Sequence, residues 1–397
     1  MCKHDVSPVE LGGRMVVQRF LNRNLVWKSL CTFLILNATG CGGGGSDSSS
    51  ALSSTPTICT VSGVPSVSQV TGALSNGQTV TITGSGFGNC GPTVVLFDDF
   101  EKGTNGNPIS TASGSAQVGH WTAVEDIPHN PRYSTAYRHS GSNCFLADQS
   151  TGDGGHWAVV NFPGTYFVYA SYWVFLPSDR EVPGTGESLG PNWKLADITG
   201  GNYLAGEYAS NWTAGVVLGD LSLAPGTFQL PNPWHDAAGL TELGYGSTSW
   251  TKGRWHRFEN FYAGGWSGNG IVQMWETNAS NARTTVCNEL NLNTLHPGDA
   301  WSWFRLHAYA RQDASGQCYY DDIYVATGPG ARARVEIGNA PNYEDCTNLA
   351  IFTPTVWNET AINAQVRSGS FLAGQNAFLF VINASGTASA GYPLTMD

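Results

Sequence analysis

Short runs of aromatic and β-branched residues, each bounded by Gly, Pro, Asn or Ser, fill most of the chain between residues 98 and 346. Such runs favour β-strands, and the bounding residues favour the turns between strands. We find no stretch with the apolar period of an amphipathic helix. The clearest runs are 165–176, 192–199, 254–262, 270–277, 301–311 and 318–326. The pattern predicts an all-β fold, built as a two-sheet sandwich or jelly roll.

The composition is typical of an extracellular β-protein and excludes other classes. The chain has 397 residues, of which 49 are Gly and 14 are Trp, and only 12% are charged. That length can bury a full core and is sufficient for two domains, which argues against disorder. The 30 acidic residues outnumber the 19 basic ones, giving a net charge of −11, and no cluster of Lys and Arg offsets it. Because an acidic surface repels phosphate backbones, we do not expect nucleic-acid binding.

Residues 1–40 have the pattern of an export signal. Basic Arg19, Arg23 and Lys28 precede an apolar run at 30–36, which is too short to span a bilayer and is typical of a signal peptide. Met15 is the more plausible start of the protein.

The segment Ala38-Thr39-Gly40-Cys41 resembles the bacterial lipobox. The resemblance implies lipidation of Cys41, membrane contact through this lipid anchor only, and a location at the outer membrane or cell surface. Plain secretion is the alternative. The Gly- and Ser-rich residues 41–58 then form a flexible linker.

Besides Cys41, the mature chain contains Cys59, Cys90, Cys144, Cys287, Cys318 and Cys346. An even number of cysteines in an exported protein predicts three disulfides, whose pairing the sequence leaves open. No Cys-x-x-Cys pair indicates zinc.

Strand-like segments near the two ends of the chain have a common pattern. Residues 64–88, in which Thr-Val-Thr-Ile-Thr-Gly is followed by Gly-Phe-Gly, resemble the opening half of an IPT/TIG immunoglobulin-like domain. Segments 354–362, 370–381 and 386–393 resemble its later half. The resemblance implies a discontinuous, small Ig-like β-sandwich at 59–97 plus 347–397, with residues 98–346 inserted. Two separate β-segments are the alternative.

Four short motifs of the insert resemble the concanavalin A-like family, which includes lectins, laminin-G-like modules and jelly-roll polysaccharide lyases. They lie at 97–101, 170–175, 253–259 and 319–325. The resemblance implies a concanavalin A-like jelly roll over 98–346, and it bears on fold more than on activity.

Residues 301–311 form the most informative strand of the insert. Since side chains alternate along a strand, one face is expected to be core and comprises Ser302, Phe304, Leu306, Ala308 and Ala310. The other face combines aromatic and cationic groups: Trp301, Trp303, Arg305, His307, Tyr309 and Arg311. Sugars stack on aromatic rings and arginine binds carboxylates, so this face is typical of a glycan-binding groove. A solvated outer face is the alternative.

The resemblance to jelly-roll polysaccharide lyases implies roles for three of these residues. In such enzymes an Arg offsets the charge of the uronate carboxylate, a Tyr or His removes the adjacent proton, and a Tyr protonates the leaving oxygen. Arg305 would be the carboxylate clamp, His307 the base or carboxylate partner, and Tyr309 the acid or base.

Other residues complete the candidate site. Asn260 and His256 are further catalytic candidates. The substrate-binding candidates are Trp301, Trp303, Arg311, Lys194, Trp193 and Tyr262. The Arg-x-Glu-Leu-Arg and Gln-Ile-His motifs of the best-known alginate lyase group are absent, so no residue is carried over from that group.

Acidic residues gather at both ends of the insert, with Asp98, Asp99 and Glu101 at its start and Asp321 and Asp322 in its last strand. In sandwiches of this kind the first and last strands are often neighbours, and oxygen-rich sites suit Ca²⁺. We expect a structural calcium ion with Asp98, Asp99, Glu101 and Asp322 as ligands, and no organic cofactor. Capped turns are the alternative.

Two hydrolytic chemistries lack support. The Glu-x-Asp-x-x-Glu signature of jelly-roll glucanases is absent, and the Gly-x-Ser-x-Gly match at 186–190 lies in a Pro/Gly loop rather than between a strand and a helix. The sequence favours a surface-anchored polysaccharide lyase that cleaves uronate-containing glycan by β-elimination. A non-catalytic lectin or adhesin and a structural surface module are the alternatives.

Overall fold

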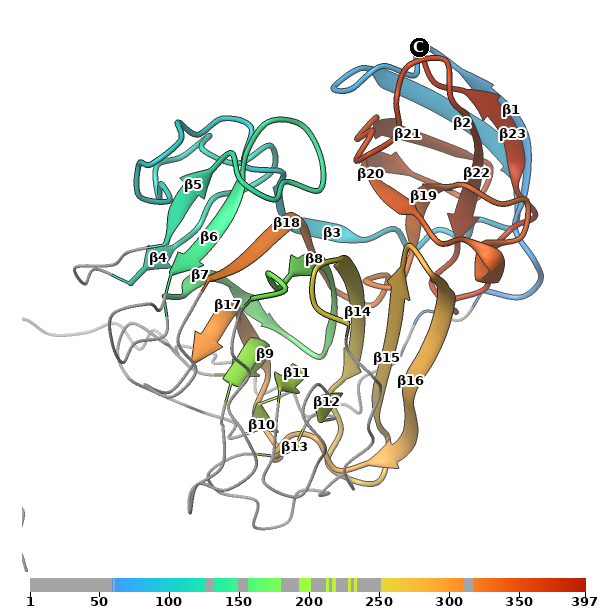
Figure 1. Ribbon diagram of the computed structural model, residues 1–397. Coiled ribbons are helices and arrows are strands. Elements are labelled where there is room, and N and C mark those ends of the chain that lie inside the picture. Colours follow the sequence, from blue (N-terminus) through green and yellow to red (C-terminus); the bar gives the residue numbers. More distant parts are fainter. Residues whose placement is uncertain are drawn as a thin grey trace, which may run out of the picture. The chain divides into compact units, whose positions relative to one another are not determined.

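The computed structural model describes residues 59, 61–125, 131–148, 156–179, 193–200, 212–213, 216–218, 228–229, 232–233, 251–309 and 317–397 (Figure 1). At 193–194, 212–213, 216–218, 228–229, 232–233 and 307–309 the description covers the strand backbone and not the side chains. The export signal, Cys41, Arg311 and the loop at 186–190 lie outside the described residues.

An eight-stranded antiparallel sheet is the larger element of the fold (Figure 1). Its strands are β3 (Thr93–Asp98), β5 (Arg132–Ser134), β6 (Cys144–Asp148), β8 (Phe167–Phe175), β14 (Trp255–Ala263), β15 (Gly270–Asn278), β16 (Asn281–Leu292) and β18 (Gln317–Thr327). Their order is β16-β15-β14-β8-β18-β6-β5, and β3 pairs with β18.

A six-stranded sheet packs against one face of the eight-stranded sheet. Its strands are β4 (Ala123–Val124), β7 (Ala158–Thr165), β9 (Trp193–Gly200), β11 (Val216–Leu218), β12 (Phe228–Gln229) and β17 (Trp301–Tyr309). Their order is β12-β11-β9-β17-β7-β4, and a separate pair is formed by β10 (Trp212–Thr213) and β13 (Asn232–Pro233).

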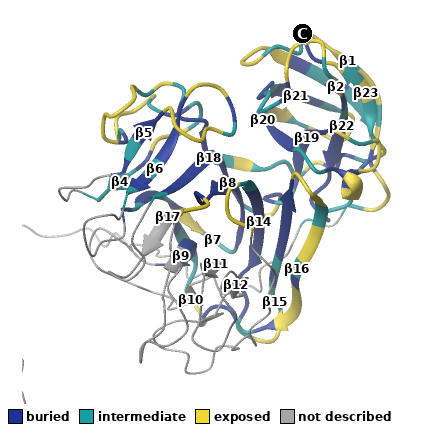
Figure 2. Cartoon of the chain, in the orientation of Figure 1, coloured by how far each residue is buried: buried dark blue, intermediate teal, exposed yellow. Residues whose placement is uncertain are grey.

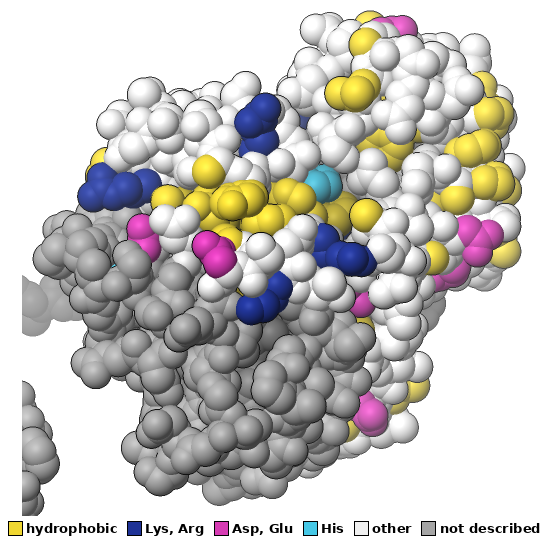
Figure 3. All heavy atoms as spheres, viewed as in Figure 1, with side chains coloured by type: hydrophobic (Ala, Val, Ile, Leu, Met, Phe, Trp, Pro, Cys, Tyr) yellow, Lys and Arg dark blue, Asp and Glu magenta, His cyan; other side chains and the backbone are white. Residues whose placement is uncertain are grey.

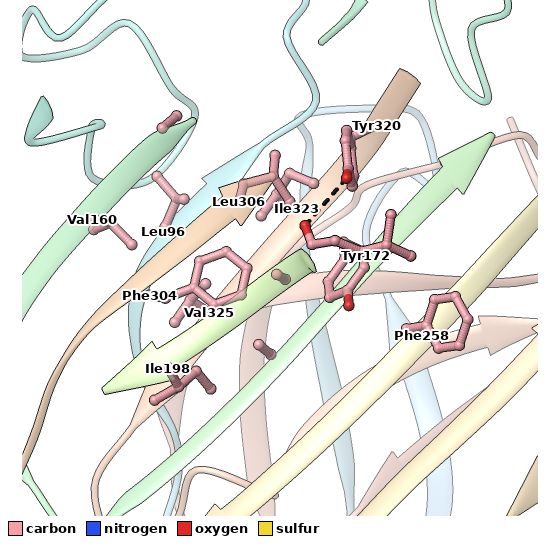
Figure 4. Packing of buried hydrophobic residues seen from close by; sticks show 14 of the residues in the cluster. Leu96, Val160, Tyr172, Ile198, Phe258, Phe304, Leu306, Tyr320, Ile323 and Val325 are labelled. Atoms are coloured by element: carbon pink, nitrogen blue, oxygen red, sulfur yellow. Dashed lines mark hydrogen bonds between the residues drawn. The ribbon is translucent and has the colours of Figure 1, made fainter. Parts of the chain in front are cut away.

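One apolar cluster fills the space between the two sheets (Figure 4). Tyr172 and Phe258 enter it from the eight-stranded sheet, and Phe304 and Leu306 enter it from β17; all four are at most 1% exposed. The hydroxyl of Tyr320 donates to the backbone carbonyl of residue 195 at 3.2 Å, which links the sheets and satisfies a buried polar group. Figure 2 shows that β8, β14 and β18, which line this core, consist largely of buried residues. The predicted all-β sandwich, with Phe304 and Leu306 inside, is confirmed.

Strands from the first and the last parts of the described chain form a third, seven-stranded sheet. Its strands are β1 (Ser66–Thr71), β2 (Thr79–Ser85), β19 (Arg334–Gly338), β20 (Leu349–Trp357), β21 (Ala361–Gln365), β22 (Asn376–Ile382) and β23 (Tyr392–Thr395). The order is β1-β2-β21-β20-β19-β22-β23. β2 pairs with β21, with Val80 opposite Ala364 and Ile82 opposite Ile362, and these side chains belong to one separate apolar cluster.

Two strands lie across the predicted domain boundaries. β3 belongs to the expected Ig-like domain except for its last residue, Asp98, yet it pairs with β18 in the eight-stranded sheet. β19 lies within the expected insert, yet it pairs with β20 and β22. The assignment of the seven-stranded part to the IPT/TIG family stays a prediction.

The described residues contain no α-helix; a single 3₁₀ turn, η2, spans Tyr343–Asp345. Within the described part of the chain, no helix has the length and apolarity needed to cross a membrane.

Charged side chains at most 6% exposed connect β14 and β16 to β19. Arg257 donates to Glu336 at 2.9 Å, and Arg334 donates to Glu336 at 2.6 Å and to Glu259 at 3.1 Å. Arg283 donates to Glu259 at 2.9 Å. We call these five residues the buried ion-pair cluster. Each charge has an opposite partner, which offsets the desolvation that burial would otherwise impose on it.

The cysteines correct one prediction. Among the described cysteines one disulfide forms, between Cys59 and Cys90, so the expectation of three is wrong. The other four are free and buried: Cys144, Cys287, Cys318 and Cys346. Cys144 and Cys318 lie on neighbouring strands but on opposite faces of the sheet, because Cys318 enters the main core and Cys144 a separate cluster. These thiols pack as small apolar side chains.

Candidate functional site

β17 lies in the middle of the six-stranded sheet, between β9 and β7. Its residue Arg305 is the register partner of Asp197 on β9 and of Val159 on β7. Since Phe304 and Leu306 on either side of it point into the core, Arg305 faces outward from the sandwich.

Arg305 and Asp197 form a bidentate ion pair. The Nε atom of Arg305 donates to Oδ1 of Asp197 at 3.0 Å, and its Nη2 donates to Oδ2. The Asp197 side chain is fully buried, whereas the Arg305 side chain is 13% exposed. The guanidinium carbon also lies 5.3 Å from the ring centroid of Trp303. Two parallel hydrogen bonds and a ring contact hold the guanidinium in one orientation.

Asp197 is a site residue that the sequence analysis does not identify. It stands alone as a charge among Leu195, Ala196 and Ile198, all of which are at most 3% exposed. An isolated carboxylate in a buried strand indicates a cationic partner on a neighbouring strand, and this signal could have revealed it.

His307 and Tyr309 continue β17 beyond Arg305, and their side chains lie outside the described residues. The register pairs Tyr309 with Lys194 of β9, after a shift between residues 306 and 309. Trp193, at the start of β9, pairs with Leu218 of β11. Arg305, His307, Tyr309 and Lys194 therefore occupy two adjacent strands.

Strict alternation fails at the start of β17. The pairing of β17 with both neighbours shifts between Trp301 and Trp303, as in a β-bulge. Trp301 consequently enters the core, where its ring lies 6.4 Å from that of Tyr262, and it is fully buried. Trp303 is only 1% exposed. The expectation that both indoles share the face of Arg305 and stack on sugar does not fit this arrangement.

His256, Asn260 and Tyr262 lie on β14, in the opposite sheet. Asn260 and Tyr262 are on the inner face, where the Tyr262 hydroxyl lies 3.5 Å from Oδ1 of Asn260. His256 is fully buried, and its Nδ1 is 2.6 Å from a carboxylate oxygen of Glu276. The structure does not bring these residues together with Arg305, because they face the inside of the sandwich while Arg305 faces out of it.

The acidic residues of the first and last strands do come together, since Asp98 is the register partner of Ile323 on β18. Asp98 is fully buried, and its two oxygens accept from the backbone N–H of Phe100 at 2.9 Å and from Nε1 of Trp121 at 2.7 Å. Burial raises the pKa of Asp98 to about 7. Burial and the nearby negative charge of Asp322 raise the pKa of Asp99 to about 6.

The remaining proposed calcium ligands also have protein partners. Glu101 accepts from the backbone N–H groups of Ser142 and Asn143, each at 2.7 Å. Asp322 lies 2.8 Å from Nδ1 of His139. In the described part of the chain, no group of three or more His, Cys, Asp or Glu side chains is arranged to hold a metal ion. These carboxylates fit capped turns better than a calcium cage, and calcium binding stays a prediction.

No protein-family model matches this chain, and no curated protein sequence matches it. Solved structures do resemble it. They include an endo-β-1,4-glucuronan lyase from the fungus Trichoderma reesei, with 14% identity and a TM-score of 0.36 over 52% of this chain and 91% of that one. A PL-14 alginate lyase from Aplysia kurodai has 12% identity and a TM-score of 0.39 over 59% of this chain and 100% of that one. The alginate lyase Aly36B has 13% identity and a TM-score of 0.39 over 59% of this chain and 97% of that one. Likeness at this level assigns neither a family nor an activity.

Proposed function

We propose that this chain is a polysaccharide lyase that cleaves uronate-containing glycan by β-elimination at the outer face of the six-stranded sheet. The observation that most directly supports this is the bidentate pair of Arg305 with Asp197, on a strand that continues with His307 and Tyr309. An oriented guanidinium, an imidazole and a phenol are the groups needed for elimination beside a carboxylate.

The chemistry begins when the uronate carboxylate binds the guanidinium of Arg305. This positive charge stabilises the negative charge that develops as the C5 proton leaves, and His307 or Tyr309 accepts that proton. The electron pair of the C5–H bond forms the C4–C5 double bond. The C4–O4 bond then breaks with its electron pair on O4, and Tyr309 protonates O4. The products are an unsaturated uronate and a free hydroxyl, and neither water nor an oxidant is consumed.

Lys194 gives this proposal a second cation beside the first. The backbone register makes Lys194 of β9 the partner of Tyr309 on the neighbouring strand. A lysine at this position adds a cation to the proposed site, in a chain whose net charge is −11.

The test is incubation of the mature protein with alginate, glucuronan and a neutral glucan, while the ultraviolet absorbance of the unsaturated product is recorded. We expect a rise with one of the uronate polymers, which Tyr309→Phe, His307→Ala and Arg305→Ala each reduce by at least about 100-fold. Arg132→Ala, which removes an arginine from β5 of the other sheet, is the matched control and should leave the rate unchanged. A flat trace on every uronate polymer would contradict the proposal.

We also propose that Cys41 is lipidated and that residues 41–58 hold the folded part away from a membrane. The motif Ala38-Thr39-Gly40-Cys41 and the Gly/Ser-rich composition that follows support this. Fractionation of expressing bacteria should find the protein with membranes, and Cys41→Ala should transfer it to the soluble fraction. An unchanged distribution of this variant would contradict the lipid anchor.

A further inference from the structure

A row of large apolar side chains crosses four adjacent strands on the outer face of the eight-stranded sheet. Leu146 of β6 is opposite Tyr319 of β18, which is opposite Phe175 of β8, which is opposite Trp255 of β14. These side chains form a cluster separate from the main core, because their neighbours along each strand point inward. We call these four residues the aromatic row.

Tyr137, in the turn between β5 and β6, lies on this row. Its ring stacks on that of Phe175, with centroids 4.6 Å apart and planes 21° from parallel, and it meets the ring of Tyr319 at 5.0 Å. The residue is nevertheless 51% exposed. The Phe175 ring stacks on the Tyr137 ring while the residue stays half-exposed, so part of the phenol lies at the surface.

The backbone of Tyr137 is in an unfavourable conformation, with φ of 46°. Bulky residues rarely occupy this left-handed region, where glycine is preferred and other residues pay a cost in free energy. In the described part of the chain, Phe100 and three other non-glycine residues also have positive φ, so this conformation alone does not distinguish Tyr137. What distinguishes Tyr137 is that its ring is stacked on the row and the residue is still half-exposed.

The surroundings of the row are polar and carry charges of both signs. The Tyr319 hydroxyl donates to Oε1 of Gln317, and Nε2 of Gln317 donates to Asp148 at 3.1 Å. Arg138, next to Tyr137, is exposed and lies near Cys144 of the same cluster. Figure 3 shows a stripe of hydrophobic side chains bordered by Lys and Arg side chains and also by Asp and Glu side chains. A ring face beside an arginine is suited to a sugar that bears a carboxylate.

We propose that the aromatic row with Tyr137 is a second glycan-binding surface, which holds a chain of the uronate polymer away from the site at β17. A pyranose ring stacks on Tyr137, while the Arg138 side chain attracts a sugar carboxylate. This inference rests on the proposed function for the identity of the glycan. The surface itself lies on the other sheet of the sandwich from Arg305, so it binds glycan without taking part in the elimination.

The test is electrophoresis of the Tyr309→Phe protein in native gels that contain alginate, glucuronan or a neutral cellulose derivative. Tyr137→Ala should weaken retardation by the uronate polymer about fivefold, the equivalent of losing one ring contact. Tyr137→Gly should weaken it equally and raise the melting temperature, because glycine accepts the positive φ. Tyr137→Phe should keep most of the retardation, since the ring remains. Leu372→Ala, at an apolar side chain that is 72% exposed in the seven-stranded part, is the control and should have no effect.

The other possible results separate the second glycan-binding surface from the proposed lyase activity. Unchanged retardation of both Tyr137→Ala and Tyr137→Gly overturns the second surface, and so does the absence of retardation of the Tyr309→Phe parent in every gel. Retardation by the cellulose derivative alone overturns the preference for uronates. Loss of binding in the Tyr137 variants, together with no elimination activity in the unmodified protein, would leave the second surface standing and contradict only the lyase.

Discussion

The guanidinium of Arg305 on β17 is held by the fully buried carboxylate of Asp197 on β9, with Nε 3.0 Å from Oδ1. The two residues are register partners on neighbouring strands, so the pair is built into the sheet rather than into a loop. A strand position limits the movement of both side chains. The guanidinium of Arg305 therefore has a defined orientation before any ligand binds.

Asp197→Asn tests whether this orientation matters for catalysis. The variant keeps the size of the side chain but removes its charge, and a hydrogen bond to a charged group contributes about 1.5–3 kcal/mol. We expect kcat/KM on the uronate polymer to fall roughly 10- to 100-fold. Because Asp197 acts through Arg305, Asp197→Asn in an Arg305→Ala background should cause little further loss. Asp345→Asn, at an exposed carboxylate of η2, is the control, and a full additive loss in the double variant would contradict a positioning role.

Replacing a glutamate by glutamine should destabilise the protein strongly inside the buried ion-pair cluster and hardly at all at its exposed edge. Glu336→Gln removes a fully buried charge that faces Arg257 and Arg334, and leaving those cations uncompensated should lower the free energy of unfolding by about 3–5 kcal/mol. Glu344→Gln also breaks a pair with an arginine at 3.0 Å, but this carboxylate is 66% exposed, so the change should stay within about 0.5 kcal/mol. Urea denaturation of the two variants measures the difference. Equal effects would show that burial of the charge is not the deciding factor.

The raised pKa of Asp98 predicts a dependence of stability on pH. Its ordinary pKa is 3.8 and burial raises it to about 7, so the folded protein binds more protons than the unfolded chain between these values. The contribution of this group is therefore fully present below about pH 4 and is lost as the pH rises toward about 7, by up to about 4 kcal/mol. Asp98→Asn cannot titrate and should lack this part of the slope. Urea midpoints of the two proteins across that range provide the measurement, and parallel curves would contradict the assignment.

The four buried cysteines that form no disulfide should determine how many thiols a thiol reagent detects in the absence of a reductant. Burial raises the pKa of Cys287 to about 12 and that of Cys346 to about 11, and burial also raises the pKa of the Cys144 thiol. Native protein should therefore react slowly with a thiol reagent. After denaturation of the mature protein, Cys144, Cys287, Cys318 and Cys346 should react, whereas Cys59 and Cys90 should react only after reduction. Absence of reactive thiols in the denatured protein would restore the original expectation of three disulfides.

The all-β architecture could be predicted because it depends on local properties of the chain. Aromatic and β-branched runs with Gly-rich turns specify strands wherever they pack, and alternation correctly assigned Phe304 and Leu306 to the core. The same rule put Trp301 on the face of Arg305, and there it failed. A bulge adds one residue to a strand and reverses the faces beyond it, and its presence depends on how β17 pairs with β7 and β9.

Only the part of the candidate site that lies on a single strand could be predicted from the sequence. Arg305, His307 and Tyr309 could be assigned to one strand from their spacing in the chain, because a strand assignment needs no knowledge of its neighbours. Three other features follow from how the strands pair: Asp197 is the partner of Arg305, His256 and Asn260 face the interior from the opposite sheet, and the remaining thiols lie apart. Side-chain periodicity is a property of the backbone of a single strand, whereas contacts between strands depend on register and on which sheet each strand joins.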